Sequence, residues 1–165
     1  LAIKIEQLRE LTDWNVPIYV KIGASRVLND VKLAVKTGAD VIVLDGMQAG
    51  TAASQQGFIE HTGIPTLPAV RQAVEALEEM DVMGQVQLIV SGGIRTGADV
   101  AKALALGADA VCLGRASRWG LGAFGEAGAQ KVIEIINTEL VHAMAAVGRT
   151  TIAAIDRSIV RTNFP

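Results

Sequence analysis

The sequence contains a single cysteine, Cys112, and aromatic side chains make up only 4% of its 165 residues. One cysteine excludes a disulfide framework, a cysteine-rich zinc site and a cysteine-ligated iron–sulfur cluster within this chain. Few aromatics and no basic stripe argue against nucleic-acid binding, which needs stacking platforms or clustered Lys and Arg. No apolar run is long enough to span a membrane. We therefore expect a cytoplasmic protein with neither a secretory leader nor a metal site.

The composition is that of a globular domain with a sizeable core. Half of the residues are hydrophobic, 19% are charged, and the net charge is −2. This length suits one domain over residues 1–165.

Short β-rich apolar runs alternate with longer helical segments, separated by Gly and Pro. The pattern predicts strands at residues 18–22, 39–44, 87–90 and 110–113. It predicts helices at residues 30–37, 66–80 and 98–106, then glycine-rich turns and a terminal helix at 129–146. Alternating strands and helices imply parallel strands joined by right-handed crossovers.

The chain contains an internal repeat. The segment DVKLAVKTGADVIVLDG at residues 30–46 matches DVAKALALGADAVCLGR at residues 99–115, at a constant offset of 69. In each copy the helix ends at a glycine, Gly38 or Gly107, which can adopt the left-handed cap conformation. The aspartates two residues later, Asp40 and Asp109, are interpreted as turn residues.

Two copies of a strand–helix–strand unit supply four parallel strands. This arrangement predicts an α/β fold, namely half of a (β/α)₈ TIM barrel. A doubly wound open sheet is the alternative. Because four strands alone leave two open edges, the half-barrel needs another half, either a missing amino-terminal half-barrel or a second copy of the chain.

In such barrels the site forms at the carboxyl ends of the strands. The last two predicted strands end in a glycine-rich pattern typical of a phosphate site, in which backbone N–H groups approach an anion closely. Arginines can add charge-assisted hydrogen bonds, and the helix beginning near Gly97 can direct its positive end inward. The candidate cofactor-binding residues are Ser91, Gly92, Gly93, Arg95, Gly114 and Arg115. Glycines that only turn the chain and arginines that pair with carboxylates are the alternative.

Lys21 ends an otherwise apolar strand, and strand alternation can direct it into the barrel, where it would stabilise negative charge. The following loop, GMQAGTAASQQ at residues 46–56, is uncharged and small enough to approach a planar ligand. An exposed edge-strand lysine and a flexible surface loop are the alternatives. Cys112 lies within a predicted strand and is interpreted as a core residue.

Three segments resemble one family: VKIGASRVLNDVKLAVKTGADVIVLDGMQAGTAAS, GIPTLPAV and QLIVSGGIRTGADVAKALALGADAVCLG. They are similar to the FMN-binding barrel of glutamate synthases and glutamate-synthase-like proteins, including the group related to the methylamine–glutamate N-methyltransferase subunit. The resemblance covers residues 16–115, about strands five to eight of such a barrel. The GGIRTGADVAKALALGADAV stretch is also similar in FMN-dependent 2-hydroxyacid oxidases, type 2 isopentenyl diphosphate isomerases and IMP dehydrogenases, whereas GTAAS with GIPTLPA favours the glutamate-synthase group.

The resemblance implies FMN as the cofactor. Lys21 would lie by the pyrimidine edge of the flavin, and the backbones at residues 91–95 and 114–115 would hold the phosphate. The loop at residues 46–54 would border flavin and substrate, with Gly50, Thr51 and Ser54 as its substrate-facing residues. Met47 stands where these enzymes place a His. Lys21, Met47 and Gln48 are the candidate catalytic residues.

Two features depart from the glutamate-synthase pattern. The segment RASRWGLGAFGEAG stands where those enzymes carry the cysteine cluster of an iron–sulfur centre, so that electron route is absent from this chain. The tail from residue 128 and the LGRA ending of the last strand are closer to 2-hydroxyacid oxidases. IMP dehydrogenase is disfavoured because its catalytic-cysteine loop is not evident.

The leading hypothesis is an FMN-dependent oxidoreductase of amino-acid metabolism that acts on an amino-acid or 2-oxo-acid centre. The first alternative is an FMN-dependent 2-hydroxyacid oxidase, which Met47 opposes. The second is a non-catalytic half-barrel that binds a phosphate ligand. The expected partners are a small-molecule substrate, a glutaminase or electron-donor partner on other chains or segments, and further copies in a homo-oligomer.

Overall fold

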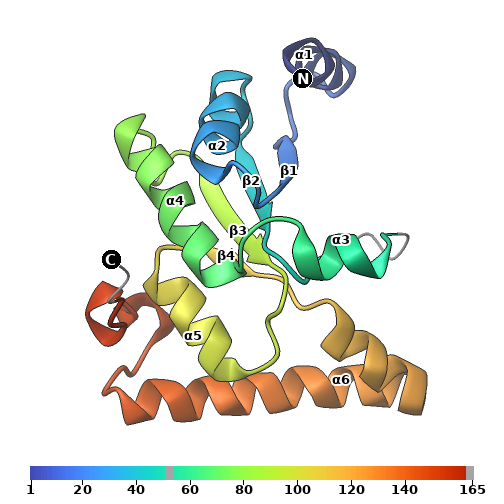
Figure 1. Cartoon of the computed structure of the whole chain (residues 1–165), viewed down its shortest axis with the longest axis vertical. Coiled ribbons are helices and arrows are strands. Elements are labelled where there is room, and N and C mark those ends of the chain that lie inside the picture. The colour runs from blue at the N-terminus through green and yellow to red at the C-terminus, as the bar shows by residue number, and fades with distance from the viewer. Residues whose placement is uncertain (51–53, 163–165) are drawn as a thin grey trace.

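The protein is seen here as a computed structural model that describes residues 1–50 and 54–162. The elements in chain order are α1 (Ala2–Leu11), β1 (Tyr19–Gly23), α2 (Val27–Lys36), β2 (Val41–Asp45), α3 (Gln56–His61), α4 (Thr66–Glu79), β3 (Gln87–Ser91), α5 (Gly97–Ala105), β4 (Ala110–Val111), α6 (Arg115–Ala146) and the short 3₁₀ turns Ile152–Ala154 and Arg157–Ile159. Figure 1 shows their arrangement. Among the helices described, none combines the length and apolar character that crossing a membrane requires.

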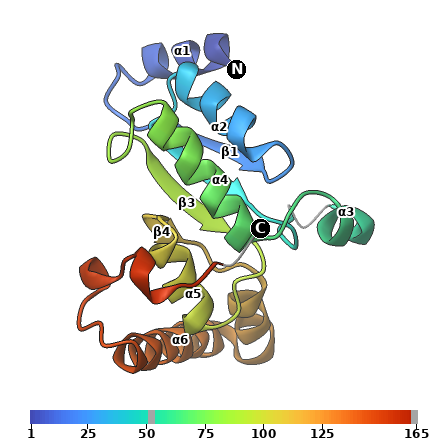
Figure 2. The same cartoon turned by 60° about the vertical axis from the view of Figure 1, so that its left-hand side comes forward.

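The four strands form one parallel sheet in the order β1-β2-β3-β4, and each strand pairs with the next one along the chain. Helices α2 and α4 lie side by side over one face of this sheet in both views, and α5 packs on α6 beyond β4 (Figures 1 and 2). A doubly wound sheet would reverse its strand order and carry helices on both faces. The sequential order therefore confirms a partial (β/α)₈ barrel.

The core lies between the sheet and these helices. Alternate strand residues face it and are fully or nearly fully buried, as are the helical residues that they meet: Val20, Ile42, Leu44, Leu88, Val90, Val31, Val70, Ala73 and Leu77. The residues between them face the other side, where Lys21 and Tyr19 are exposed and Val43 is only half-buried. This second face corresponds to the interior of a closed barrel, and no described element covers it.

The repeat aspartates occupy equivalent places. The Asp40 carboxylate accepts the backbone N–H of Ile18 at 2.6 Å, and Asp109 accepts that of Leu88 at 2.7 Å. Each aspartate lies just before one strand, and its carboxylate thus binds the backbone at the start of the strand before it. Their interpretation as structural turn residues is confirmed.

Replacing Asp40 with Asn should lower the free energy of unfolding near neutral pH, and this loss should be smaller in acid. Partial burial raises the pKa of the Asp40 carboxyl, but hydrogen bonds from Ile18 and Arg9 and the Arg9 charge outweigh it, so the pKa lies below its ordinary value. A lowered folded-state pKa gives stability that is complete above the unfolded pKa, about 3.9, and is lost as the pH falls through the folded value. Urea unfolding of both proteins at pH 7 and pH 3 measures this, and a gap independent of pH would contradict it.

Three helices differ from the sequence-based prediction, and β4 ends at Val111 rather than at residue 113. Helix α3 and the amino-terminal helix α1 were not predicted. The segment expected to hold glycine-rich turns is helical, so that α6 begins at Arg115 rather than near residue 129, with one break at Phe124 and Gly125. Gly120 and Gly128 allow the two parts of α6 to touch on either side of that break, since a Cβ at Gly128 would stand 2.0 Å from the Gly120 oxygen. These glycines therefore allow close contact between the two parts of the helix, in addition to the turn at the break.

Candidate functional site

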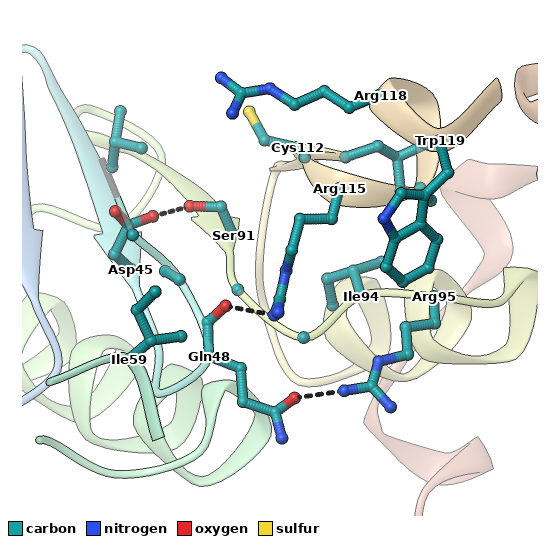
Figure 3. Close-up of a pocket in the computed structure, with 18 of the residues that line it drawn as sticks. Asp45, Gln48, Ile59, Ser91, Ile94, Arg95, Cys112, Arg115, Arg118 and Trp119 are labelled. Carbon is teal, nitrogen blue, oxygen red and sulfur yellow. Dashed lines mark hydrogen bonds between the residues drawn. The ribbon is translucent and has the colours of Figure 1, made fainter. Parts of the chain in front are cut away.

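A cavity of about 370 Å³ opens at the carboxyl ends of the four strands. Its lining comes from β1, the loops after β2 and β3, and the start of α6; among the residues that line it are Lys21, Asp45, Gln48, Gly92, Gly93, Arg95, Gly114, Arg115, Arg118 and Trp119. Figure 3 shows several of these side chains converging from the loops after β2 and β3 and from the start of α6. The volume falls within the range of pockets for small molecules and cofactors.

The loop after β3 is held in a conformation that only glycine adopts easily. Gly92 and Gly93 have φ angles of +99° and +70°, and a Cβ at Gly92 would stand 2.7 Å from the Gly46 oxygen. Thr66, which is buried, donates its hydroxyl to the carbonyl oxygens of Ser91 and Gly92. Within the described part of the chain, the N–H groups of Gly92 and Gly93 donate to no protein acceptor. They remain able to bind an anion.

Arg95 and Arg115 meet at Gln48. The Arg95 guanidinium donates to the Gln48 side-chain oxygen at 2.9 Å, and the Arg115 guanidinium donates to the Gln48 backbone oxygen at 2.7 Å (Figure 3). Gln48 has a φ of +75°, a left-handed conformation that is uncommon for a residue with a side chain. The loop after β2 thus holds both arginines at the cavity through neutral acceptors, which leaves their positive charges available.

The two helices beside the cavity differ at their amino termini. Helix α5 is closed by a capping box between Thr96 and Asp99, and the Gly97 N–H donates to the Glu139 carboxylate at 2.8 Å. The expectation that this helix directs its positive end at a ligand is therefore wrong, because protein acceptors already occupy that end. Helix α6 begins after Gly114 with no side-chain cap, and Gly114 and Arg115 line the cavity. The helix terminus available to an anion is that of α6.

Lys21 forms an ion pair that sequence reasoning missed. Its Nζ lies 2.8 Å from Asp45 Oδ2, and the Ser91 hydroxyl donates to the other carboxylate oxygen. Asp45 directly follows the strand predicted at residues 39–44 and was not among the candidate site residues. The parallel register, which pairs Asp45 with Ser91, could have indicated the contact.

The remaining predicted residues of the second-strand loop lie in different places. Gly50 lines the cavity, and Ser54 lies beside Gly50. Met47 forms a bridge with Pro65, donates its N–H to the Ile64 oxygen and is not among the cavity-lining residues. Thr51 lies outside the described residues.

Cys112 is exposed and lines the cavity, so its interpretation as a core residue is wrong. Strand β4 ends at Val111, and the N–H of Cys112 continues the ladder to Val90. Alternation then directs its side chain to the sheet face of Ser91, which none of the described helices covers. Arg118 and Trp119, on the first turns of α6, also face the cavity and were not predicted (Figure 3). Their positions follow from the early start of α6.

The cavity carries an excess of positive charge. Among the described residues, its lining includes Lys21 and three arginines, Arg95, Arg115 and Arg118, but only one carboxylate, that of Asp45. Since Asp45 is paired with Lys21, the guanidinium groups retain their charge toward the cavity. The arrangement suits an anionic ligand.

Comparison with known proteins gives a consistent set of relatives. The family model described as the conserved region in glutamate synthase matches residues 1–124. A glutamate synthase large subunit-like protein of Rhizobium meliloti is 62% identical over 122 residues, covering 74% of this chain and 28% of that protein. Mouse 2-hydroxyacid oxidase 1 is 42% identical over 160 residues, covering 96% of this chain and 38% of that enzyme. The chain therefore spans well under half the length of these relatives.

Solved structures agree with the partial barrel. A mandelate oxidase mutant with a monooxide FMN adduct superposes with a TM-score of 0.72 at 31% identity, covering 95% of this chain and 45% of that one. A mutant flavocytochrome b2 with benzoylformate gives a TM-score of 0.79 at 28% identity, covering 96% of this chain and 37% of that one. The oxidase-like similarity thus extends through the tail, whereas the family model ends at residue 124.

Proposed function

Because the chain belongs to the glutamate synthase family, we propose that it supplies the carboxyl-terminal half of an FMN-binding barrel in an oxidoreductase acting on an amino-acid or 2-oxo-acid centre. The observation that carries the proposal is the cavity at the strand ends, where the glycine loop, two arginines and an uncapped helix terminus converge beside Lys21.

The residues present fit FMN by the chemistry of their donors. A phosphate needs several N–H donors and positive charge at one place, and the glycine loop after β3, Arg95, Arg115 and the start of α6 supply both. The positive φ angles of Gly92 and Gly93 aim the backbone at the cavity without a Cβ in the way. These features support Ser91, Gly92, Gly93, Arg95, Gly114 and Arg115 as the phosphate-binding set.

Bound FMN would supply hydride exchange through N5 of its ring. The protein would hold the phosphate at one end of the cavity and place the Lys21 ammonium near the pyrimidine edge, where it stabilises negative charge on the reduced ring. Gly50 and Gln48 would border the substrate side. Arg118, a further cation in the lining, matches the carboxylate that amino acids and 2-oxo acids share.

A 2-hydroxyacid oxidase is the second candidate. It is supported by the relatives that match 94–96% of the chain, including the tail, and by the structural neighbours. The first enzyme class is favoured by the 62% identity of the Rhizobium protein, and Met47 opposes the oxidase, which needs a His base at about this place. Turnover of lactate or glycolate, compared with that of glutamate and 2-oxoglutarate, separates the two.

The uncovered sheet face supports a proposal about partners. A closed barrel would cover the exposed side of β1 and the half-buried residues of β2 and β3, so we expect an amino-terminal half-barrel, from the same polypeptide or a second copy, to pack there. A glutaminase or electron-donor partner, a homo-oligomeric assembly and a cytoplasmic location remain part of the proposal.

The test is the visible absorption spectrum of the full-length protein, with identification of any cofactor released by acid. We expect flavin absorption bands and released FMN. A colourless protein that also fails to take up added FMN would exclude the oxidoreductase and favour a phosphate-binding module.

A further inference from the structure

Asp45 occupies a central place on the cavity face of the sheet. The register pairs it with Gly23 on β1 and with Ser91 on β3. Gly23 has no side chain, and a Cβ there would meet nothing within 4 Å, so open space adjoins Asp45 on the β1 side. Lys21, two residues earlier on the same face, reaches diagonally into this space.

Both oxygens of the Asp45 carboxylate are engaged, one on each side. Oδ2 pairs with Lys21 Nζ at 2.8 Å, and Oδ1 accepts the Ser91 hydroxyl (Figure 3 shows the latter). The Asp45 side chain is 15% exposed, whereas that of Lys21 is 56% exposed. A lysine on a flexible four-carbon stem with so much exposure has many rotamers available, and a carboxylate fixed at both oxygens restricts them.

We propose that Asp45 is a positioning residue for Lys21: the carboxylate, anchored by Ser91, holds the ammonium at the cavity, and the two charges act there as one unit. This inference rests on the proposed function, in which Lys21 faces the pyrimidine edge of FMN. It assigns a role to a residue that the sequence pattern alone did not single out.

The pairing predicts that Asp45→Asn changes FMN affinity and reduction potential in opposite directions, depending on whether Lys21 is present. With Lys21 present, Asp45→Asn removes the contact that holds the ammonium, so FMN affinity and the reduction potential of the bound flavin should both fall. With Lys21→Met present, Asp45 is an unpaired, largely buried carboxylate beside an anionic ligand. In that background Asp45→Asn deletes a repulsive charge, so affinity and potential should both rise.

The experiment is a double-mutant cycle in the full-length protein: wild type, Asp45→Asn, Lys21→Met and the double variant. FMN dissociation constants come from quenching of flavin fluorescence, and potentials from equilibration with a reference dye. We expect Asp45→Asn to weaken FMN affinity about fivefold when Lys21 is present and to strengthen it about fivefold in the Lys21→Met background. Ser91→Ala, which frees one oxygen of the carboxylate, should act like Asp45→Asn but more weakly.

Other outcomes identify which idea is wrong. If the Asp45 carboxylate acts on the flavin by its own charge, Asp45→Asn would raise FMN affinity and reduction potential both with Lys21 and with Met at that position. If Asp45 is merely structural, the substitution would lower them in both cases. Either result overturns the inference, whereas FMN binding by the wild type upholds the proposed function. A wild type that takes up no FMN overturns the proposed function, and this inference with it.

Discussion

Replacing Arg95 and Arg115 together by alanine should weaken FMN binding by about a hundredfold or more. Each guanidinium lines the cavity next to the glycine loop and is held there by Gln48. A hydrogen bond to a charged group contributes about 1.5–3 kcal/mol, and about 1.4 kcal/mol corresponds to tenfold in affinity. The effect should be large because Gln48, a neutral acceptor, positions both groups without cancelling their charge. Titration of FMN followed by fluorescence measures the loss.

Arg26→Ala is the matched control, since Arg26 is exposed and pairs at the surface with Asp30. It should leave FMN affinity unchanged. The single variants should each lose part of the affinity, and wild-type binding should weaken as salt is added, because the contacts are electrostatic. Unaltered binding by the double variant, with an unchanged unfolding temperature, would place the phosphate elsewhere.

Gly97→Ala should reduce the free energy of unfolding by about 3 kcal/mol, the upper part of the usual range for overpacked sites. Gly97 is the first residue of α5 and is buried where that helix meets α6. A Cβ at this position would stand 2.0 Å from the backbone N of Leu140 and 2.6 Å from the Ile136 oxygen. Since these are backbone atoms of a long helix, no side-chain rotation relieves the contact, and α5 must move away from α6.

Gly122→Ala provides the opposite case with the same chemical change. Gly122 lies in α6, and a Cβ there would meet nothing within 4 Å. Because alanine is the better helix former, this variant should be more stable by about 0.5 kcal/mol. Urea unfolding of both variants measures the difference. Equal effects of the two substitutions would show that α5 and α6 are not in close contact at Gly97.

Sequence reasoning located the parts of the site that follow directly from strand ends. Gly92, Gly93, Arg95, Gly114 and Arg115 all line one cavity, although Arg95 and Gly114 are 19 positions apart in the chain. The reason is geometric: in a parallel sheet all strands end at the same edge, so polar residues that follow each strand must meet there. The repeat similarly identified Asp40 and Asp109 as turn residues, and both carboxylates accept a backbone N–H.

The missed features depend on side-chain neighbours from other strands or helices. Asp45 directly follows a predicted strand, and only the register with Ser91 and the gap at Gly23 make it the partner of Lys21. Cys112 belongs to a residue type that is usually buried in cores, but β4 ends before it, and no described helix covers the sheet face on which its side chain lies. In both cases the adjacent residues in the sequence do not show which side chains from other strands or helices lie nearby.

Local sequence was therefore sufficient for the four strands, helices α2, α4 and α5, the half-barrel and the glycine and arginine donors, because periodicity and chain turns depend on residues close together in the sequence. Tertiary packing decided which helix terminus stays open. The capping box of Thr96 and Asp99 is local, but it is Glu139, 42 positions away, that binds the Gly97 N–H of α5, while α6 begins uncapped beside Gly114. It also decided that Lys21 faces the cavity already paired. Such choices rest on contacts between segments far apart in the chain, which become defined only when the sheet and its helices pack together.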